Sequence, residues 1–128
     1  MVQKIEQLDR FDHTANELAS IRDWLSKNGG EGDFEAPGPL LSRSTAGCRL
    51  LEWRTHRVSL ICFRGEGSPD GPPEAHLVVL EDGAEFAHMG SEPILLENGD
   101  WATALWRDGG KTYLLATKEG SASLRRLL

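Results

Sequence analysis

The chain lacks the long apolar runs and the cysteine density that mark membrane spans and disulfide-rich secreted domains. No apolar run approaches the ~20 residues that a membrane-spanning helix needs. The opening stretch, MVQKIEQLDRFDH, is polar and lacks the apolar core of a secretory signal. Two cysteines among 128 residues are too few for a disulfide framework and leave the redox compartment open. Taken by themselves, these features predict a soluble, cytoplasmic protein.

An excess of positive charge is also missing. The chain has 14 basic and 20 acidic residues, which gives a formal net charge of −6. Nonspecific nucleic-acid binding depends on Lys and Arg side chains that neutralise phosphates, so this balance argues against a nucleic-acid partner. The longest basic run is Arg125-Arg126, which suits the C-terminal end of a helix, where the macrodipole favours cations.

Catalytic and metal-binding motifs are absent as well. The sequence contains no G-x-G-x-x-G, no G-x-x-x-x-G-K-[ST] phosphate loop and no G-x-S-x-G nucleophile elbow. The histidines are scattered and show none of the local spacings that build zinc sites; they are His13, His56, His76 and His88. We therefore predict no catalytic residue, no metal site, no cofactor and no enzymatic activity.

Helical periodicity is present in the first part of the chain. Thr14 and Glu17 have the spacing of a capping box, in which each side chain satisfies a free N–H at the start of a helix. Gly29 and Gly30 predict its end, because glycine tolerates the left-handed conformation at a helix C-terminus. The apolar stripe of this helix comprises Ala15, Leu18, Ile21 and Leu25, with Trp24 beside it, and a shorter apolar lead-in comprises Val2, Ile5, Leu8 and Phe11.

The chain divides into three segments that together form one compact domain. Residues 1–30 are the helical segment, 31–46 a Pro/Gly connection and 47–128 an α+β sheet domain. The connection either packs across the domain or forms a flexible linker. Alternating patterns bounded by turn clusters predict the strands, which are Cys48–Trp53, Arg57–Phe63, Ala75–Leu80, Trp101–Arg107, Thr112–Thr117 and, more weakly, Pro93–Leu96.

The predicted fold class is α+β: an N-terminal helix, a mostly antiparallel sheet of five to six strands and a short C-terminal helix. The sequence Asp108-Gly109-Gly110 separates two of the strands and predicts a hairpin turn. In the last helix we expect Ser121 or Ser123 as the N-cap. Three leucines should face inward, namely Leu124, Leu127 and Leu128.

The stretch GCRLLEWRTHRVSLICF carries both cysteines on two strands of one predicted hairpin. A two-residue turn at Thr55-His56 puts Cys48 and Cys62 on opposite faces, because side chains alternate along a strand. A three-residue turn at 54–56 puts the two cysteines directly opposite each other, where they could form a disulfide or a redox pair. The first register separates the apolar residues more cleanly, so we favour two reduced and buried thiols. Cys48 and Cys62 are still the candidate redox pair.

Four tryptophans are many for a chain of this length. Trp101 and Trp106 lie on one predicted strand at an odd spacing, so they should face opposite sides of the sheet. Either the tryptophans pack in the core, or one face of the sheet offers a Trp to a protein partner or small ligand. His56, at the predicted hairpin tip, is the most exposed histidine. The candidate binding residues are therefore Trp101, Trp106 and His56.

Several stretches resemble one kind of bacterial regulator. They are GCRLLEWRTHRVSLICF, AHLVVLE, WATALWRDGGKTYLLAT and SLRRLL, and they lie within residues 47–128. These stretches resemble the C-terminal extracytoplasmic region of bacterial membrane-anchored anti-sigma factors and related membrane proteins. In such proteins an N-terminal cytoplasmic segment, often with a His-x-x-x-Cys-x-x-Cys zinc motif, holds the sigma factor, and a membrane helix follows it. This chain contains neither the zinc motif nor the membrane helix.

The resemblance implies a non-enzymatic sensor or interaction domain in transcription regulation, located in the periplasm. Such a module would contact the membrane only through a segment absent from this chain. On the oxidising side of a membrane, the pair Cys48 and Cys62 gains interest. The alternative hypothesis is a small cytoplasmic enzyme or thiol-redox protein that uses Cys48 or Cys62, with His56 as its partner.

Overall fold

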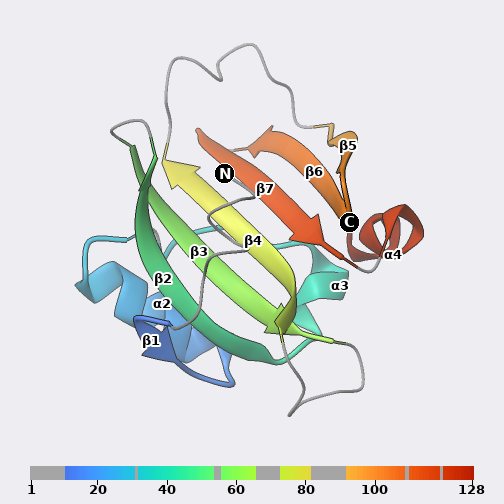
Figure 1. The fold of residues 1–128 in the computed structure, drawn as a ribbon. Coiled ribbons are helices and arrows are strands. Elements are labelled where there is room, and N and C mark those ends of the chain that lie inside the picture. Colours follow the sequence, from blue (N-terminus) through green and yellow to red (C-terminus); the bar gives the residue numbers. More distant parts are fainter. Residues whose placement is uncertain are drawn as a thin grey trace.

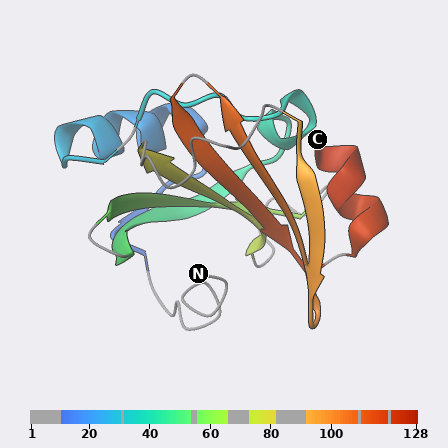
Figure 2. The ribbon, with the colours of Figure 1, turned by 90° about the horizontal axis from the view of Figure 1, so that it is seen from above.

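Seven antiparallel strands form one sheet, and the helices lie on one of its faces (Figures 1 and 2). The computed structural model describes residues 11–30, 32–53, 56–65, 73–81, 92–108, 110–118 and 120–128. In chain order the elements are β1 (His13–Thr14), α2 (Leu18–Lys27), α3 (Gly38–Leu41), β2 (Thr45–Trp53), β3 (His56–Arg64), β4 (Pro73–Glu81), β5 (Ile94–Asn98), β6 (Trp101–Asp108), β7 (Lys111–Thr117) and α4 (Ser121–Leu127). The order across the sheet is β1-β2-β3-β4-β7-β6-β5. The predicted α+β class with an antiparallel sheet and a short C-terminal helix is confirmed.

The predicted number of strands, five to six, is wrong because β1 adds a seventh. This strand pairs His13 with Cys48 and Thr14 with Gly47. The Asp12 side chain fixes it further, since the Leu50 N–H donates to Asp12 Oδ2 at 2.8 Å. A strand of two residues is too short to leave an alternating apolar pattern, so the sequence carried no signal for it.

The predicted capping box is also wrong. Thr14 belongs to β1, and α2 begins at Leu18 with Glu17 as its N-cap and no side-chain cap. Pairing of Thr14 with β2 takes its backbone out of the helix, which no local spacing rule anticipates. The expected stripe does face the core: Ile21 and Leu25 are fully buried. The lead-in residues Val2, Ile5 and Leu8 lie outside the described residues.

The end of α2 follows the predicted glycine signal. Gly29 adopts a φ of +83°, which an L side chain rarely takes. Its carbonyl accepts a hydrogen bond from Arg57 Nη1 at 3.0 Å. A Cβ at this position would meet the same guanidinium. The turn therefore stops the helix and ties it to β3.

Of the two alternatives for the Pro/Gly connection, the structure has it packed across the domain. Phe34 and Leu40 are buried in the core, and Leu40 belongs to the short helix α3. Arg22 of α2 donates to the carbonyls of Gly32 and Phe34 at 3.1 and 2.7 Å. Its guanidinium carbon also lies 4.2 Å from the centre of the Phe34 ring.

The sheet separates two clusters of buried side chains, one on each face. The helix face is the side on which α2, α3 and α4 pack, and the second face is the opposite side (Figure 2). Sheet residues buried on the helix face include Cys48, Ile61, Phe63, Leu77, Val79, Ala104, Trp106, Tyr113 and Leu115. Those of the second face are Ala46, Val58, Leu60, Cys62, Val78, Leu80, Trp101 and Ala116. Alternation along each strand produces this division.

The C-terminal helix differs in detail from the expectation. Its N-cap is Gly120, at a φ of +99°, and no side chain caps it, so neither predicted serine cap is present. Ser123 lies inside the helix and is buried. Leu124 and Leu127 are buried as expected, but Leu128 follows the last turn and is 36% exposed. Within the described part of the chain, no helix is long and apolar enough to span a membrane.

Candidate functional site

The register of the β2–β3 hairpin answers the question of the two cysteines. Cys48 pairs with Ile61 and Gly47 with Cys62, so the two thiols lie on opposite faces of the sheet. Both are buried and free, as the favoured prediction states, and the directly opposed pair is excluded.

The predicted turn, however, is in the wrong place. The last pair of the hairpin is Trp53 with His56, so His56 is a strand residue and not part of the predicted Thr55-His56 turn. The observed register therefore differs by two residues from the favoured one. A shift of two residues leaves every side chain on its original face, so the hydrophobic pattern could not distinguish the two registers.

Cys62 has a histidine neighbour that the sequence did not suggest. Cys62 and His76 are directly paired residues of β3 and β4, and Cys62 Sγ lies 3.0 Å from His76 Nδ1. The sequence hypothesis gave the thiol a different partner, His56, which starts β3 and pairs with Trp53. The His56 side chain lies outside the described residues. The β3–β4 register brings His76 to Cys62, and no local pattern in the sequence determines that register.

The protein environment keeps this pair uncharged. Burial raises the pKa of the Cys62 thiol to about 12. Burial also lowers the pKa of His76 to about 4, and the nearby positive charge of Lys118 contributes to the decrease. At pH 7 a neutral thiol and a neutral imidazole therefore share this hydrogen bond, and the imidazole tautomer determines which of them donates. A catalytic cysteine needs a thiolate, which this environment disfavours.

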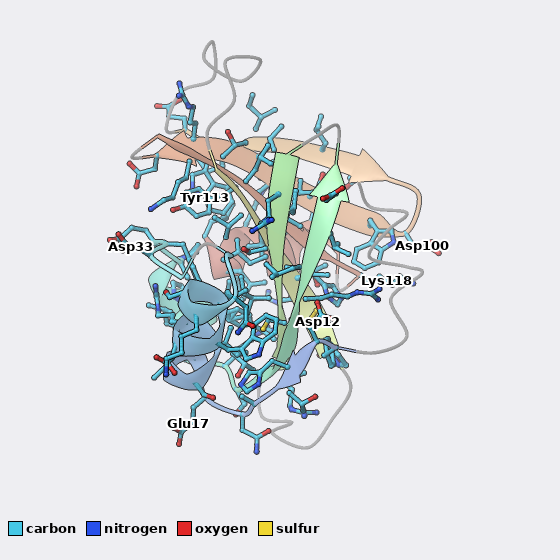
Figure 3. The ribbon with its side chains drawn as sticks, turned by 90° about the vertical axis from the view of Figure 1, so that its left-hand side faces the viewer. Asp12, Glu17, Asp33, Asp100, Tyr113 and Lys118 are labelled. Atoms are coloured by element: carbon cyan, nitrogen blue, oxygen red, sulfur yellow. The ribbon has the colours of Figure 1, made fainter. Side chains whose placement is uncertain are left out.

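An aromatic side chain encloses the same pair. The His76 and Trp101 rings meet edge to face with centroids 5.5 Å apart. Lys118 Nζ lies 5.0 Å from the centre of the Trp101 ring, on the second face. Figure 3 shows Lys118 on the side of the sheet away from α2 and Tyr113 on the side of α2. Trp101 is only 5% exposed, so it covers the Cys62–His76 pair and is not exposed to a partner or ligand.

Cys48 shares the inert character of Cys62. Its side chain is fully buried on the helix face. Burial, with the Asp12 carboxylate as the smaller cause, raises the pKa of this thiol to about 11. The candidate redox pair is thus two separated, protonated thiols.

The second candidate tryptophan borders a cavity. Trp106 lies on the helix face, as its odd spacing from Trp101 predicts, and stacks on Tyr113 with centroids 5.3 Å apart. It is 8% exposed. The cavity beside it has a volume of about 220 Å³, and its other lining residues are Glu35, Ala36, Pro37, Pro93, Asp108 and Leu128. Trp106 therefore forms part of the lining of a cavity on the helix face.

The most exposed apolar surface of the sheet was missed by the sequence reasoning. Strand β5 occupies one edge of the sheet (Figure 1). Ile94, Leu95 and Leu96 are 49%, 39% and 53% exposed. The available signal was three consecutive apolar residues in the weakest predicted strand, with no polar alternation. Such a run is an unusual composition for an unprotected edge.

Comparisons with protein-family models, with curated proteins and with solved structures found no match to this chain. Among the residues that the structure describes, no three His, Cys, Asp or Glu side chains gather closely enough to hold a metal ion.

Proposed function

We propose that this chain is a non-enzymatic binding module that contacts its partner through the edge strand β5. The observation that carries the proposal is the exposure of Ile94, Leu95 and Leu96 on this edge. Edge strands present unpaired backbone N–H and C=O groups, and proteins commonly shield them with charges, proline or covering elements. An exposed apolar edge is suited to binding an extended segment by strand addition.

The chemistry of the buried side chains favours binding over catalysis. The thiol of Cys62 and the imidazole of His76 lie in contact at 3.0 Å, and both are neutral at pH 7. Nucleophilic catalysis by cysteine requires an accessible thiolate. The alternative of a thiol enzyme therefore has the correct residue types in an unfavourable environment.

The wider biological role rests on the sequence resemblance. We place the module in the extracytoplasmic part of an anti-sigma-like membrane protein, where it would sense or bind a partner and regulate transcription. The stretches that carry the resemblance correspond to β2, β3, β4, β6, β7 and α4. They are mostly the packed strands of the sheet, and β5 lies outside them as the proposed contact element.

Site-specific photo-crosslinking in cells that make the full gene product tests the contact surface. A photoreactive amino acid at Leu96 should give a discrete covalent adduct, because this side chain is half exposed on the edge. The same amino acid at Lys27, exposed on α2, is the matched control and should give none. Equal labelling at both positions, or no adduct at 94, 95 and 96, would contradict binding through β5.

The compartment is tested independently. A reporter enzyme that is active only in an oxidising compartment is fused after Leu128 in the full gene product. Activity is expected if the module lies outside the cytoplasm. Activity from a matched reporter that functions only in the cytoplasm would refute the extracytoplasmic placement while leaving the contact surface intact.

A further inference from the structure

We infer that the partner of β5 is the β5 strand of a second copy of this chain, paired antiparallel about a two-fold axis at Leu95. The inference rests on the proposed function, because it takes β5 as the contact surface. Two copies joined in this way would share one continuous sheet, with helix face beside helix face.

The β5–β6 hairpin determines which backbone groups of β5 are free. Asn98 and Trp101 close the hairpin around Gly99 and Asp100, and Leu96 pairs with Thr103. In an antiparallel ladder, hydrogen-bonded and non-hydrogen-bonded pairs alternate. The closing pair and the Leu96 pair are therefore bonded inward, towards β6. Thr103 Oγ1 also donates to the Leu96 carbonyl, which agrees with this direction.

Alternation then directs the backbone groups of Leu95 and Glu97 outward. In an antiparallel pair centred on Leu95, the two Leu95 residues exchange both N–H and C=O hydrogen bonds. Glu97 of each copy lies opposite Pro93 of the other. The Glu97 N–H donates to the Pro93 carbonyl of the other copy. Because Pro93 has no N–H, the Glu97 carbonyl finds no donor there and accepts a hydrogen bond from water instead.

The side chains match in the same register. Ile94 and Leu96 project on the second face, because they pair with Leu105 and Thr103, which have the strand parity of Trp101. A two-fold axis at Leu95 puts Ile94 of one copy opposite Leu96 of the other, and Leu95 opposite Leu95 on the helix face. Each exposed apolar side chain thus gains an apolar cross-strand partner.

Neighbouring registers lose this match. An axis at Leu96 would set Leu95 opposite Glu97, so an apolar side chain would face a carboxylate. An axis at Glu97 would set the two carboxylates directly opposite each other, which is destabilising. The Leu95-centred register keeps Glu97 opposite an uncharged residue. It is the one that satisfies charge, backbone and apolar contact together.

The rest of the fold leaves room for this pairing. Helix α4 packs mainly on β6 and β7, which leaves Leu95 39% exposed on the helix face. The other edge strand, β1, has only two residues in the described chain. Beyond β1, the Leu50 N–H of β2 already donates to Asp12 Oδ2, so that edge is partly satisfied. Pairing of β5 with the same strand of a second copy is isologous and closes as a dimer.

The contact is short, so association should be weak and measurable only at high protein concentration, up to about 1 mM. Each copy has a formal net charge of −6. Repulsion between two acidic copies is screened by salt, so the dimer fraction should rise with ionic strength. A basic protein partner would show the opposite salt dependence.

Sedimentation equilibrium of the wild-type chain and of Leu95→Pro tests the pairing. Proline at this outward-facing position removes only the N–H that serves the second copy and leaves the β5–β6 ladder intact. We expect a concentration-dependent dimer for the wild type and a monomer for Leu95→Pro, with unchanged circular dichroism. Leu41→Lys, at an exposed leucine of α3, is the control and should dimerise like the wild type. A wild type that stays monomeric at all concentrations would overturn the inference.

Cysteine crosslinking tests the axis. Residues directly opposite in a hydrogen-bonded pair have Cα atoms about 5.5 Å apart, within disulfide range. Under mild oxidation Leu95→Cys should form a covalent dimer, and Leu96→Cys should not, because its counterpart in the second copy is Ile94. Crosslinking of Leu96→Cys alone would overturn the proposed axis. A cellular adduct from Leu96 to a different protein, with a monomeric purified chain, would overturn self-pairing and preserve the binding function.

Discussion

The centre and the edge of the sheet have opposite properties. At the centre, β3 and β4 bring together a thiol and an imidazole, Cys62 and His76, at 3.0 Å and seal them in an uncharged environment. At the edge, β5 exposes three side chains that have no reactive group. At the centre the thiol and the imidazole are inaccessible, and at the edge the three exposed side chains offer apolar contact beside free backbone groups. That contrast favours binding as the function.

The largest expected effect is on thiol reactivity. Cys48 and Cys62 are both fully buried, so alkylation must wait for the protein to open. Iodoacetamide at pH 7.5 should modify them at least about a thousand-fold more slowly in the native protein than in denaturant, as an opening free energy of about 4 kcal/mol implies. Mass spectrometry of the digested protein measures both rates. Fast modification of either thiol would show that it is accessible in the folded protein and would restore the thiol-enzyme hypothesis.

The next largest effect is on the free energy of unfolding. The same substitution, leucine to alanine, is made once at the centre of the sheet and once at its edge. Leu77 is fully buried at the centre, and Leu77→Ala should lower the free energy of unfolding by about 2–5 kcal/mol. Leu96 is 53% exposed, and Leu96→Ala should cost less than about 0.5 kcal/mol in the monomer. Urea denaturation at low protein concentration determines both values. Similar losses would mean that the edge is packed in solution and not open.

A smaller effect should appear as a pH dependence of stability. The pKa of His76 falls from an ordinary value of 6.5 to about 4 in the folded state. Between these values the unfolded chain binds a proton that the folded chain does not, so stability is full above pH 6.5 and decreases as the pH falls towards 4. The contribution lost between pH 7.5 and pH 5 should be about 2 kcal/mol.

The His76→Gln variant isolates this contribution. The glutamine amide can donate to or accept from the Cys62 thiol but does not titrate, so the stability of the variant should fall less between pH 7.5 and pH 5. Leu41→Gln, at an exposed leucine of α3, is the control for the substitution itself and should keep the wild-type slope. An unchanged slope in His76→Gln would show that the centre of the sheet is open to solvent protons.

Much of the sheet could be predicted from local pattern. The alternation of apolar residues located β2, β3, β4, β6 and β7, and it assigned Cys48 and Cys62 to opposite faces. The glycines after Asp108 marked the β6–β7 turn, where Asp108 pairs with Lys111. These features depend on residues that are close in sequence, which is why single-strand patterns suffice for them.

Features that depend on distant segments could not be predicted in this way. The strand β1 and the loss of the Thr14 cap follow from pairing with β2, over thirty residues away in the chain. The contact of Cys62 with His76 follows from the β3–β4 register. The β2–β3 register itself was predicted two residues away from the observed one, because both registers bury the same faces.

The sequence by itself determined which side chains share a face, since alternation is a local property of an extended chain. It also determined that the chain offers no familiar catalytic or metal-binding spacing. Only the tertiary structure decided what those faces meet: an imidazole beside Cys62, a stacked Tyr113 beneath Trp106, and open edge for Ile94, Leu95 and Leu96. Strand order brings residues far apart in sequence into contact, and the exposure of a strand depends on whether another strand lies beside it.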